Sequence, residues 1–247
     1  MKRLNSFLHF GYFTDYESPK YKLDYSGIDK SQYDNFSTDE ILEIVWKSLV
    51  SSFEKYIDTD KPVVVPLSGG MDSRFILGML LNYYNPKDIF TYTVGTKGTL
   101  DFDLARKVAN LVGTNHREIN LPDYNYTLSE FKEISKRTSH QCVLFFSHPI
   151  SIIDSYPSNS QIWTGFMGDN LFGSSFEKYP SKDISSAIQR WIKIDKRNII
   201  DTSAVSLADP NFDLSRLIDM PFVHSNKISF DEQLNLYYRQ VNHVSPH

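Results

Sequence analysis

Residues 67–73 read Leu-Ser-Gly-Gly-Met-Asp-Ser and lie between two apolar segments of different periodicity. The segment 61–67 holds three consecutive valines with a proline on each side. Such a run is typical of a strand that is buried on both faces of a parallel sheet. After the stretch, apolar residues recur at helical spacing from Phe75 to Tyr83. The sequence therefore predicts a buried strand, a glycine turn and a helix that begins at the turn.

The turn itself has the composition of an anion-binding loop. The adjacent glycines, Gly69 and Gly70, let the backbone approach a ligand closely. The first N–H groups of a helix have no partner within it, and the helix dipole favours negative charge there. Ser68 and Ser73 add hydroxyl groups, and the carboxylate of Asp72 suits a site in which Mg²⁺ lies between it and phosphate groups. The stretch predicts a phosphate or pyrophosphate site; the alternative is an ordinary turn in which Asp72 only begins the helix.

Strand and helix patterns alternate after this turn. We expect strands over 89–94, 116–121 and 161–165, and helices from Asp103 and over 127–137. Strands that alternate with helices through short joints predict an α/β fold, a parallel twisted sheet flanked by helices. In such a sheet, ligands bind at the carboxyl ends of the strands, where the glycine turn would lie.

Another helix is predicted before the first strand. Ser37 and Glu40 have the spacing of a capping box, which marks the start of this helix. Apolar residues then recur with a helical period, and we expect one broad face of the helix to be buried. These residues are Ile41, Leu42, Val45, Trp46, Leu49, Val50 and Phe53.

The chain is predicted to form one α/β domain with two appendages. Residues 1–36 are rich in Tyr, Asp and Ser, and we expect them to be an irregular arm. Residues 37–180 carry the alternating pattern of the α/β domain. Residues 181–247 are expected to be a mainly helical extension packed on the same domain, with the clearest helical patterns over 184–194 and 230–241.

Composition argues against several classes of function. The 247 residues carry 26 Lys and Arg against 30 Asp and Glu, and this acidic balance argues against a nucleic-acid partner, which requires a basic surface. The only cysteine, Cys142, excludes an internal disulfide, a four-cysteine zinc site and a two-cysteine redox pair. No run approaches the ~20 apolar residues that cross a membrane. A reduced, cytoplasmic location is expected.

Three segments resemble a known family. Residues 68–73 resemble the pyrophosphate loop of the N-type ATP pyrophosphatases, the PP-loop superfamily, whose members cleave ATP between its α and β phosphates and form an adenylate. Two further segments resemble the synthetase domain of the asparagine synthetase family. One runs from Thr91 to His116 and ends in Gly-Thr-Asn-His; the other, 164–173, reads Thr-Gly-Phe-Met-Gly-Asp-Asn-Leu-Phe-Gly and resembles the second glycine loop of that family. The resemblance extends over about residues 37–180.

The resemblance implies an adenine nucleotide alpha hydrolase-like fold with ATP and Mg²⁺ as cofactors. Asp72 and Asp169 would bind Mg²⁺ and, together with Ser68, act in catalysis. The residues that would hold the pyrophosphate are Ser68, Gly69, Gly70 and Ser73. Those that would line the rest of the nucleotide site are Gly95, Leu67 and Val94, the last two beside the adenine, and Thr164 and Gly165 beside the ribose and the acyl substrate.

Two positions depart from the family pattern. Phe166 stands where the family has a glutamate that can serve as a base during attack on the adenylate, and a phenylalanine moves no proton. Asn170 stands where the family has a second glutamate. The glutaminase domain, which starts with a cysteine in the family, is also expected to be missing, because residue 2 is Lys2.

The expected activity is that of an AMP-forming carbon–nitrogen ligase. It would adenylate a small-molecule carboxylate and transfer it to ammonia or an amine, with release of pyrophosphate. The nitrogen would come from free ammonia, from a separate glutaminase subunit or from an amine on the substrate, and a homo-oligomer is also compatible with the sequence. Two alternatives stay open: a catalytically degenerate nucleotide-binding module of an assembly, and a PP-loop enzyme that modifies a nucleoside or tRNA.

Overall fold

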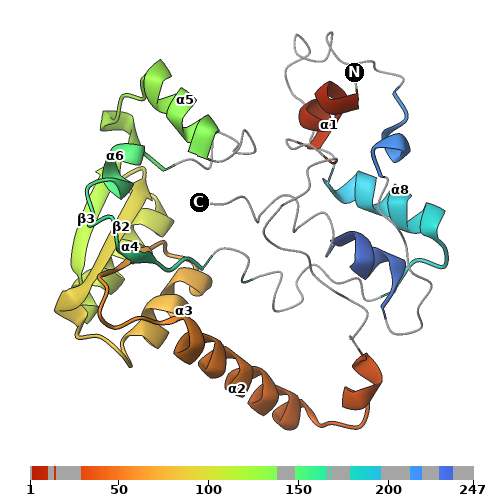
Figure 1. Ribbon diagram of the computed structural model, residues 1–247, viewed down its shortest axis with the longest axis horizontal. Helices are drawn as coiled ribbons and strands as arrows, with labels where there is room; N and C mark the ends of the chain where they lie inside the picture. Colours follow the sequence, from red (N-terminus) through yellow and green to blue (C-terminus); the bar gives the residue numbers. More distant parts are fainter. Residues whose placement is uncertain are drawn as a thin grey trace. The chain divides into compact units, whose positions relative to one another are not determined.

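The computed structural model describes residues 2–10, 14, 29–137, 148–165, 168, 179–195, 212–218 and 228–235 (Figure 1). The chain divides into two compact units. The sheet unit consists of residues 36–131 and 148–172, and the helical unit consists of residues 1–35, 132–147 and 173–247. The domain boundaries predicted from the sequence, 37–180 and 181–247, stay predictions.

The sheet unit contains the predicted parallel sheet. Its strands are β1 (Val63–Pro66), β2 (Ile89–Gly95), β3 (Asn115–Asn120) and β4 (Gln161–Ile162), in the order β3-β2-β1-β4. All neighbouring pairs are parallel, and Val63 aligns with Ile89 on one side and with Gln161 on the other. The chain moves outward from β1 to β3 and then returns to the other side of β1. This reversal places a topological switch point between β1 and β4, where open α/β sheets bind ligands.

The sheet is covered on both faces, as the run of valines predicted. Alternate residues of a strand point to opposite faces. Val63 and Val65 belong to one core, which also contains residues of α3 (Met71–Leu80) and α4 (Leu100–Val112). Val64 belongs to a second core on the opposite face, with Tyr92, Ile119 and Ile152, and Ile152 lies in α6 (Ile150–Ile153). The α/β fold class is therefore confirmed.

The described part of the chain contains further helices. They are α2 (Thr38–Tyr56), η2 (Pro86–Asp88), η3 (Leu121–Asp123), α5 (Leu128–Arg137), α1 (Lys2–Phe10), η1 (Lys30–Tyr33), α8 (Ile184–Asp195) and η5 (Leu214–Leu217). Residues 230–235 are also helical. The strands and helices predicted between residues 37 and 162 all form, with α4 beginning a turn before Asp103 and β4 ending before Trp163. None of the helices in the described part of the chain is long and apolar enough to cross a membrane.

The helix α2 forms where it was predicted, but much of its apolar face lies in solvent. The capping box is present: the Ser37 hydroxyl accepts a hydrogen bond from the Glu40 N–H, and the Glu40 carboxylate accepts one from the Ser37 N–H. Of the expected buried face, however, Leu42 is 60% and Trp46 is 53% exposed, and only Phe53 is fully buried. The reason is that only the last turns of α2 reach the core of the sheet unit, where Phe53 packs on Trp163.

The helical unit has its own apolar core. Phe10 of α1 lies against Trp191 of α8, with ring centroids 4.9 Å apart, and Leu217 and Leu234 complete the core. A helix at residues 2–10 thus stands where an irregular arm was expected, because its apolar face finds a partner that is distant in sequence. Of the two helices predicted at the end of the chain, the first forms as α8; the second is described only over 230–235.

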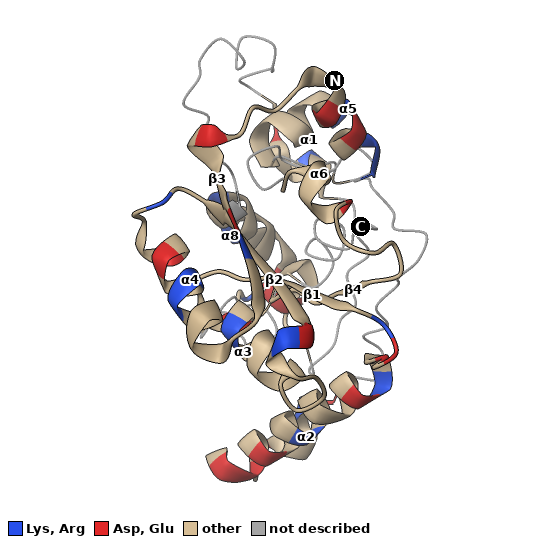
Figure 2. Cartoon of the chain, turned by 90° about the vertical axis from the view of Figure 1, so that its left-hand side faces the viewer, with Lys and Arg blue, Asp and Glu red and all other residues tan. Residues whose placement is uncertain are grey.

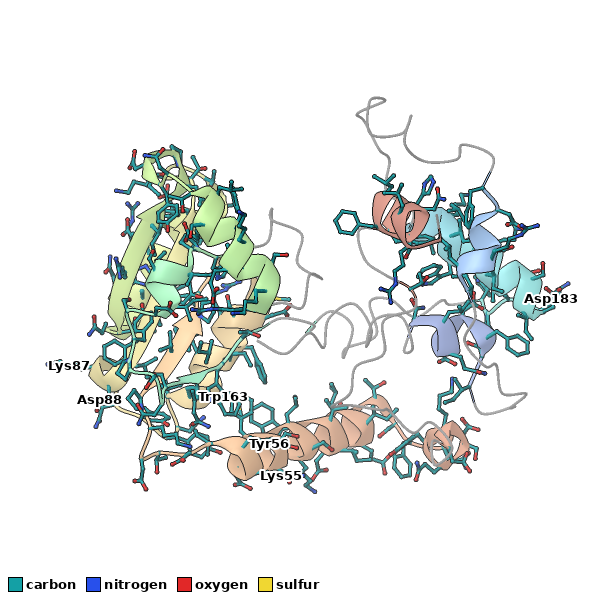
Figure 3. All side chains as sticks on the ribbon, turned by 45° about the horizontal axis from the view of Figure 1, so that its top comes forward. Lys55, Tyr56, Lys87, Asp88, Trp163 and Asp183 are labelled. Carbon is teal, nitrogen blue, oxygen red and sulfur yellow. The ribbon has the colours of Figure 1, made fainter. Side chains whose placement is uncertain are left out.

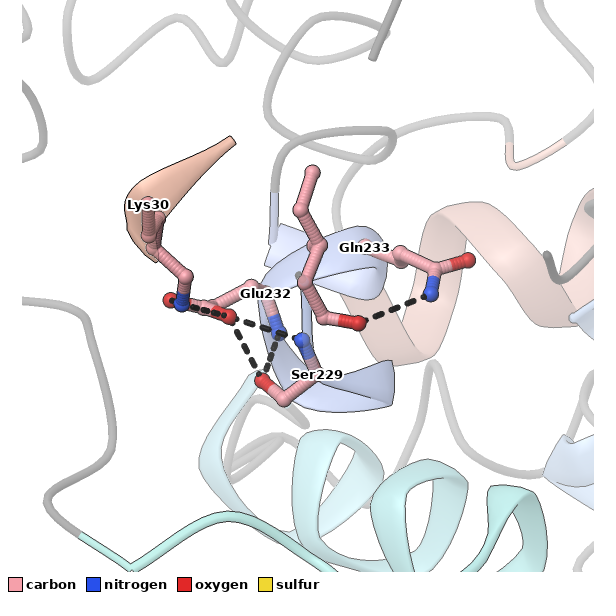
Figure 4. A network of polar contacts seen from close by, with 5 residues as sticks. Lys30, Ser229, Glu232 and Gln233 are labelled. Atoms are coloured by element: carbon pink, nitrogen blue, oxygen red, sulfur yellow. Dashed lines mark hydrogen bonds and ion pairs between the residues drawn. The ribbon is translucent and has the colours of Figure 1, made fainter. Parts of the chain in front are cut away.

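A polar network closes one edge of this helical unit (Figure 4). The Lys30 ammonium group lies 2.7 and 2.8 Å from the two carboxylate oxygens of Glu232. The same carboxylate accepts a hydrogen bond from the Ser229 N–H, and the Ser229 hydroxyl accepts one from the Glu232 N–H. This reciprocal pair is a capping box for the helix at 230–235. Although burial raises the pKa of Glu232, the hydrogen bonds from Lys30 and Ser229 leave it below its ordinary value.

Candidate functional site

The glycine turn of residues 67–70 follows β1 at the carboxyl edge of the sheet. Its first residue is held on two sides: the Leu67 N–H donates to the Tyr92 carbonyl (2.8 Å), and the Thr93 hydroxyl donates to the Leu67 carbonyl (2.7 Å). Leu67 is buried in the core beneath α3. The turn is therefore fixed at its base by β2, which is why it leaves the sheet at a defined place.

Two serine hydroxyls stabilise the turn through hydrogen bonds inside it. The Ser73 hydroxyl accepts a hydrogen bond from the Ser68 N–H (3.0 Å) and lies 3.0 Å from the Ser68 hydroxyl. The Ser68 hydroxyl in turn accepts a hydrogen bond from the Gly70 N–H (3.1 Å). Ser73 is buried, whereas Ser68 is only partly so. Both side chains thus shape the backbone of the loop, and Ser68 is the one with access to a ligand.

The helix α3 begins directly at the turn, with Gly70 as its N-cap and no side chain capping it. The first N–H groups of such a helix are available to an external acceptor, and the dipole favours an anion. The Arg74 guanidinium donates to the Gly70 carbonyl (3.0 Å), which holds this acceptor oxygen within the helix turn. Met71 and Gly70 are exposed, so the start of the helix is open to solvent.

The turn lies tightly against the start of α4. A Cβ atom on Gly69 would lie 2.8 Å from the Asp101 carbonyl oxygen and 2.9 Å from its Cα, closer than real Cβ atoms come. Glycine is therefore required here for space. The contact also brings the carboxylate of Asp101 beside the predicted pyrophosphate loop, and nothing in the sequence pattern singled this residue out.

The second glycine loop lies on the first, as far as the structure describes it. A Cβ on Gly165 would lie 2.5 Å from the backbone of Asp72 and Ser73, and one on Gly168 would lie 2.5 Å from the Asp72 Cγ. A hydrogen bond from the Gly168 N–H to the Gly165 carbonyl (3.3 Å) turns the loop at this point. Two segments that are far apart in the sequence thus meet at Asp72.

Asp72 fits one half of the expected magnesium site. Its carboxylate is partly buried in the first turn of α3, beside the second loop, and carboxylate oxygens are hard ligands that suit Mg²⁺. The other expected ligand, Asp169, lies outside the described residues, as do Phe166 and Asn170. Within the described residues, no three His, Cys, Asp or Glu side chains gather to form a metal site. Of the two expected ligands, the structure therefore describes Asp72 alone.

The residues expected around the nucleotide are only partly brought together. Thr164 and Gly165 follow β4, beside the pyrophosphate loop. Val94 packs on the core of Tyr92 and Ile119, whereas Leu67 belongs to the core on the α3 face, so these two side chains do not line one wall. Leu67 is buried, and the expected contact of Leu67 and Val94 with the adenine remains a prediction. A Cβ on the adjacent Gly95 would lie 3.3 Å from the Phe102 ring.

A histidine lies over the second core, opposite α3. The Tyr92 hydroxyl lies 2.9 Å from the His148 Nδ1, and the two rings meet edge to face. Burial, and to a smaller extent the neighbouring Tyr156, raises the pKa of Tyr92 above its ordinary value, so the phenol stays neutral. Because Tyr92 aligns with Pro66, the last residue of β1, this pair lies level with the end of the sheet that carries the loops. The pair depends on a tertiary contact that local spacing does not encode.

Comparisons with known proteins find relatives of this sequence. The sequence model of the family described as Asparagine synthase matches residues 45–243. A glutamine-hydrolyzing asparagine synthetase of Mesocricetus auratus is 33% identical over 73 residues, which cover 28% of this chain and 13% of that protein. Glutamine-hydrolyzing asparagine synthetase 3 of Arabidopsis thaliana is 32% identical over 74 residues, 27% of this chain and 13% of that protein. The match thus spans only a small part of these relatives.

A solved structure is similar at a lower level. It is the NH3-dependent NAD synthetase from Campylobacter jejuni subsp. jejuni NCTC 11168 in complex with the nitrate ion. The alignment covers 74% of this chain and 89% of that one, with 17% identity and a TM-score of 0.32. A structural similarity this low gives no information about the functional site.

Proposed function

This chain belongs to the asparagine synthase family, and we propose that it is an ATP- and Mg²⁺-dependent, AMP-forming ligase. It adenylates a small-molecule carboxylate, releases pyrophosphate and transfers the acyl group to ammonia or an amine. The observation that carries this proposal is the meeting of two glycine loops at Asp72, directly at the start of α3. The first loop supplies an anion-binding turn, and the second loop would form one side of the nucleotide site.

Within this proposal, the first loop binds the β and γ phosphates as the leaving pyrophosphate. The N–H groups at the start of α3 and the Ser68 hydroxyl face the phosphate oxygens, since Ser73 holds the loop from inside. Charge that develops on the leaving group is stabilised by donors that are already in place. The reacting carboxylate and the α phosphate are held together in one site, which removes much of the entropic cost of the reaction.

Asp72 is the residue of this chain that would hold Mg²⁺, and Asp169 is proposed as its partner. The bound ion would offset the negative charge of the phosphates and so allow an anionic carboxylate to approach them. The carboxylate of Asp72 has the position for this role, because it lies beside the second loop and in the first turn of α3. Thr164, Gly165, Val94 and Gly95 are proposed to contact the nucleoside and the acyl substrate.

The nitrogen donor is proposed to be ammonia or an amine of the substrate. Phe166 stands where the family has a residue that could take up a proton from the nitrogen, so another group of the site or of the substrate must accept that proton. A separate glutaminase subunit and self-association are further proposals for partners, and the cytoplasm is the proposed location.

The proposal is tested by pyrophosphate release. The purified chain is incubated with ATP, Mg²⁺ and a panel of carboxylic acids, with and without ammonium, and pyrophosphate and AMP are measured. We expect release that depends on one class of acid, and Asp72→Asn should abolish it while the circular dichroism spectrum is retained. Undiminished release by Asp72→Asn contradicts the assignment of Asp72, and absence of ATP binding to the unmodified chain contradicts the proposed function.

A second candidate function is nucleotide binding without turnover. Phe166 and Asn170 favour this candidate, because both stand where the asparagine synthetase family has glutamates. ATP binding in calorimetry without pyrophosphate release, over the same panel of acids, would support this candidate. The third candidate is a nucleoside- or tRNA-modifying enzyme. It is less favoured because α2 and α4 each carry acidic as well as basic residues (Figure 2), so neither helix offers a basic surface for RNA.

A further inference from the structure

Two glycines of the second loop lie too close to Asp72 for any side chain. A Cβ on Gly165 would lie 2.5 Å from the Asp72 carbonyl carbon and 2.5 Å from the Ser73 nitrogen. A Cβ on Gly168 would lie 2.5 Å from the Asp72 Cγ and 2.7 and 2.8 Å from its two carboxylate oxygens. Real Cβ atoms essentially never show separations this short. Any other residue at either position would therefore have to move Asp72 or the loop.

The reason for glycine at these positions is space and not backbone conformation. Among the glycines that the structure describes, positive φ angles occur at Gly98 and Gly113, and a Cβ at either of those two positions would meet nothing within 4 Å. Gly165 and Gly168 show no such positive φ angle, but a Cβ atom at either position would clash with Asp72. A close approach between the backbone of one loop and the side chain of the other is thus built into the site.

We propose that Gly165 and Gly168 are positioning residues for Asp72, which they hold in the orientation needed to bind Mg²⁺ with the nucleotide. This inference rests on the proposed function in assigning the metal to Asp72. Gly168 covers one side of the carboxylate and excludes the side-chain rotamers that would point there. Gly165 presses on the backbone of the same residue and fixes the first turn of α3.

The two glycines act on different atoms, and this difference makes the proposal testable. Asp72→Ala removes the Cγ and both oxygens, which are the atoms that a Cβ on Gly168 would meet. The atoms that a Cβ on Gly165 would meet are the Asp72 carbonyl carbon, the Ser73 nitrogen and the Asp72 Cβ, and all three remain in that variant. Asp72→Ala should therefore remove the steric clash that Gly168→Ala introduces, but not the clash that Gly165→Ala introduces.

The first experiment measures thermal midpoints of Gly165→Ala and Gly168→Ala, each with and without Asp72→Ala. We expect Gly168→Ala to lower the midpoint by several degrees alone and to have no effect beside Asp72→Ala, while Gly165→Ala lowers it in both backgrounds. If Gly168→Ala prevents folding, the double variant should fold. Equal losses for Gly168→Ala in both backgrounds would overturn the proposal, because they would show that this glycine does not act through the Asp72 side chain.

The second experiment measures binding of the ATP analogue with a methylene group between its α and β phosphates. It is titrated by calorimetry at increasing Mg²⁺ and in EDTA. We expect Gly168→Ala to raise the Mg²⁺ concentration for half-maximal binding tenfold or more, with affinity in EDTA unchanged. The matched control is Gly78→Ala on α3, where a Cβ meets nothing within 4 Å, and it should leave both values unchanged.

The outcomes separate this proposal from the function on which it rests. An unaltered Mg²⁺ dependence in Gly168→Ala overturns the positioning role and leaves the ligase proposal standing. Failure of the unmodified chain to bind the analogue overturns the ligase proposal and the metal role of Asp72 together. In that case the midpoints of the first experiment still decide whether Gly168 restrains the Asp72 side chain.

Discussion

Phe53 and Trp163 stack with their ring centroids 4.7 Å apart and their planes 17° from parallel. Phe53 lies near the end of α2, and Trp163 follows β4, just before the second glycine loop (Figure 3). This pair ties a helix that precedes the sheet to the segment that leads to Asp72. It also explains why α2 is anchored at one end only, since the apolar residues near its start have no such partner in the part of the chain that the structure describes.

Phe53→Ala is expected to destabilise the sheet unit by about 3–5 kcal/mol, because it leaves a cavity beside Trp163 and Phe75. Leu42→Ala, on the same helix, should change the free energy of unfolding by less than about 0.5 kcal/mol, because Leu42 is 60% exposed. Urea unfolding followed by circular dichroism measures both. Similar losses in the two variants would show that the start of α2 is buried in solution.

Ser73→Ala is expected to destabilise the protein by about 1–3 kcal/mol, since it removes the acceptor of the Ser68 N–H in a buried position. ATP affinity should fall with it, because the loop loses the hydroxyl that closes it from within. Ser52→Ala is the control: its hydroxyl donates to the Ser48 carbonyl on the exposed side of α2, and little change is expected. An ATP affinity that is unchanged in Ser73→Ala would contradict the role of Ser73 in shaping the loop.

Gly78→Ala is expected to stabilise the protein by about 0.5–1 kcal/mol, because alanine in a helix restricts the unfolded chain and the added methyl group enters open space. Gly69→Ala should do the reverse, since its methyl group would meet the backbone of Asp101. Thermal midpoints of the two variants compare them directly. A midpoint for Gly69→Ala at or above that of the unmodified chain would mean that the turn and the start of α4 are not in contact.

His116 should make stability fall as the pH is lowered from 7 to 5. Burial lowers the pKa of this residue in the folded protein, and Glu118 opposes the shift only in part. Its Nδ1 lies 2.9 Å from the Thr91 hydroxyl. Below about pH 6.5 the unfolded chain gains a proton at this position that the folded protein resists, so the unfolded state is favoured. Urea unfolding at several pH values should show this slope, and His116→Gln should reduce it.

Glu232 should contribute stability at neutral pH that is lost under acid conditions. Its pKa in the folded protein lies below the ordinary value because the hydrogen bonds from Lys30 and Ser229 outweigh the effect of burial. The contribution is complete above about pH 4.5 and disappears as the pH falls through the lowered pKa. Glu232→Gln should therefore flatten the acid limb of the stability profile between pH 5 and 3. An unchanged acid limb would mean that the network in Figure 4 does not form in solution.

Local sequence was sufficient to predict the elements that carry the site. The valine run predicted β1 because burial on both faces requires apolar residues at successive positions. Ser37 and Glu40 predicted the start of α2 because a capping box joins residues three apart. The glycine turn and α3 followed in the same way, and the strand and helix periods were enough for the parallel sheet. The strands, the helices and the turn each depend on neighbours within a few residues, and for that reason the sequence alone determined them.

Tertiary structure decided which of these residues meet. The sequence did not indicate that Asp101 would lie at Gly69, that Gly168 would cover the Asp72 carboxylate, or that His148 would reach the Tyr92 hydroxyl. Nor did the apolar period of α2 show that its first turns would remain exposed. A periodic pattern states which side of an element is apolar, but not what packs against it. That partner depends on how distant segments return to the same edge of the sheet, and only the folded chain determines this.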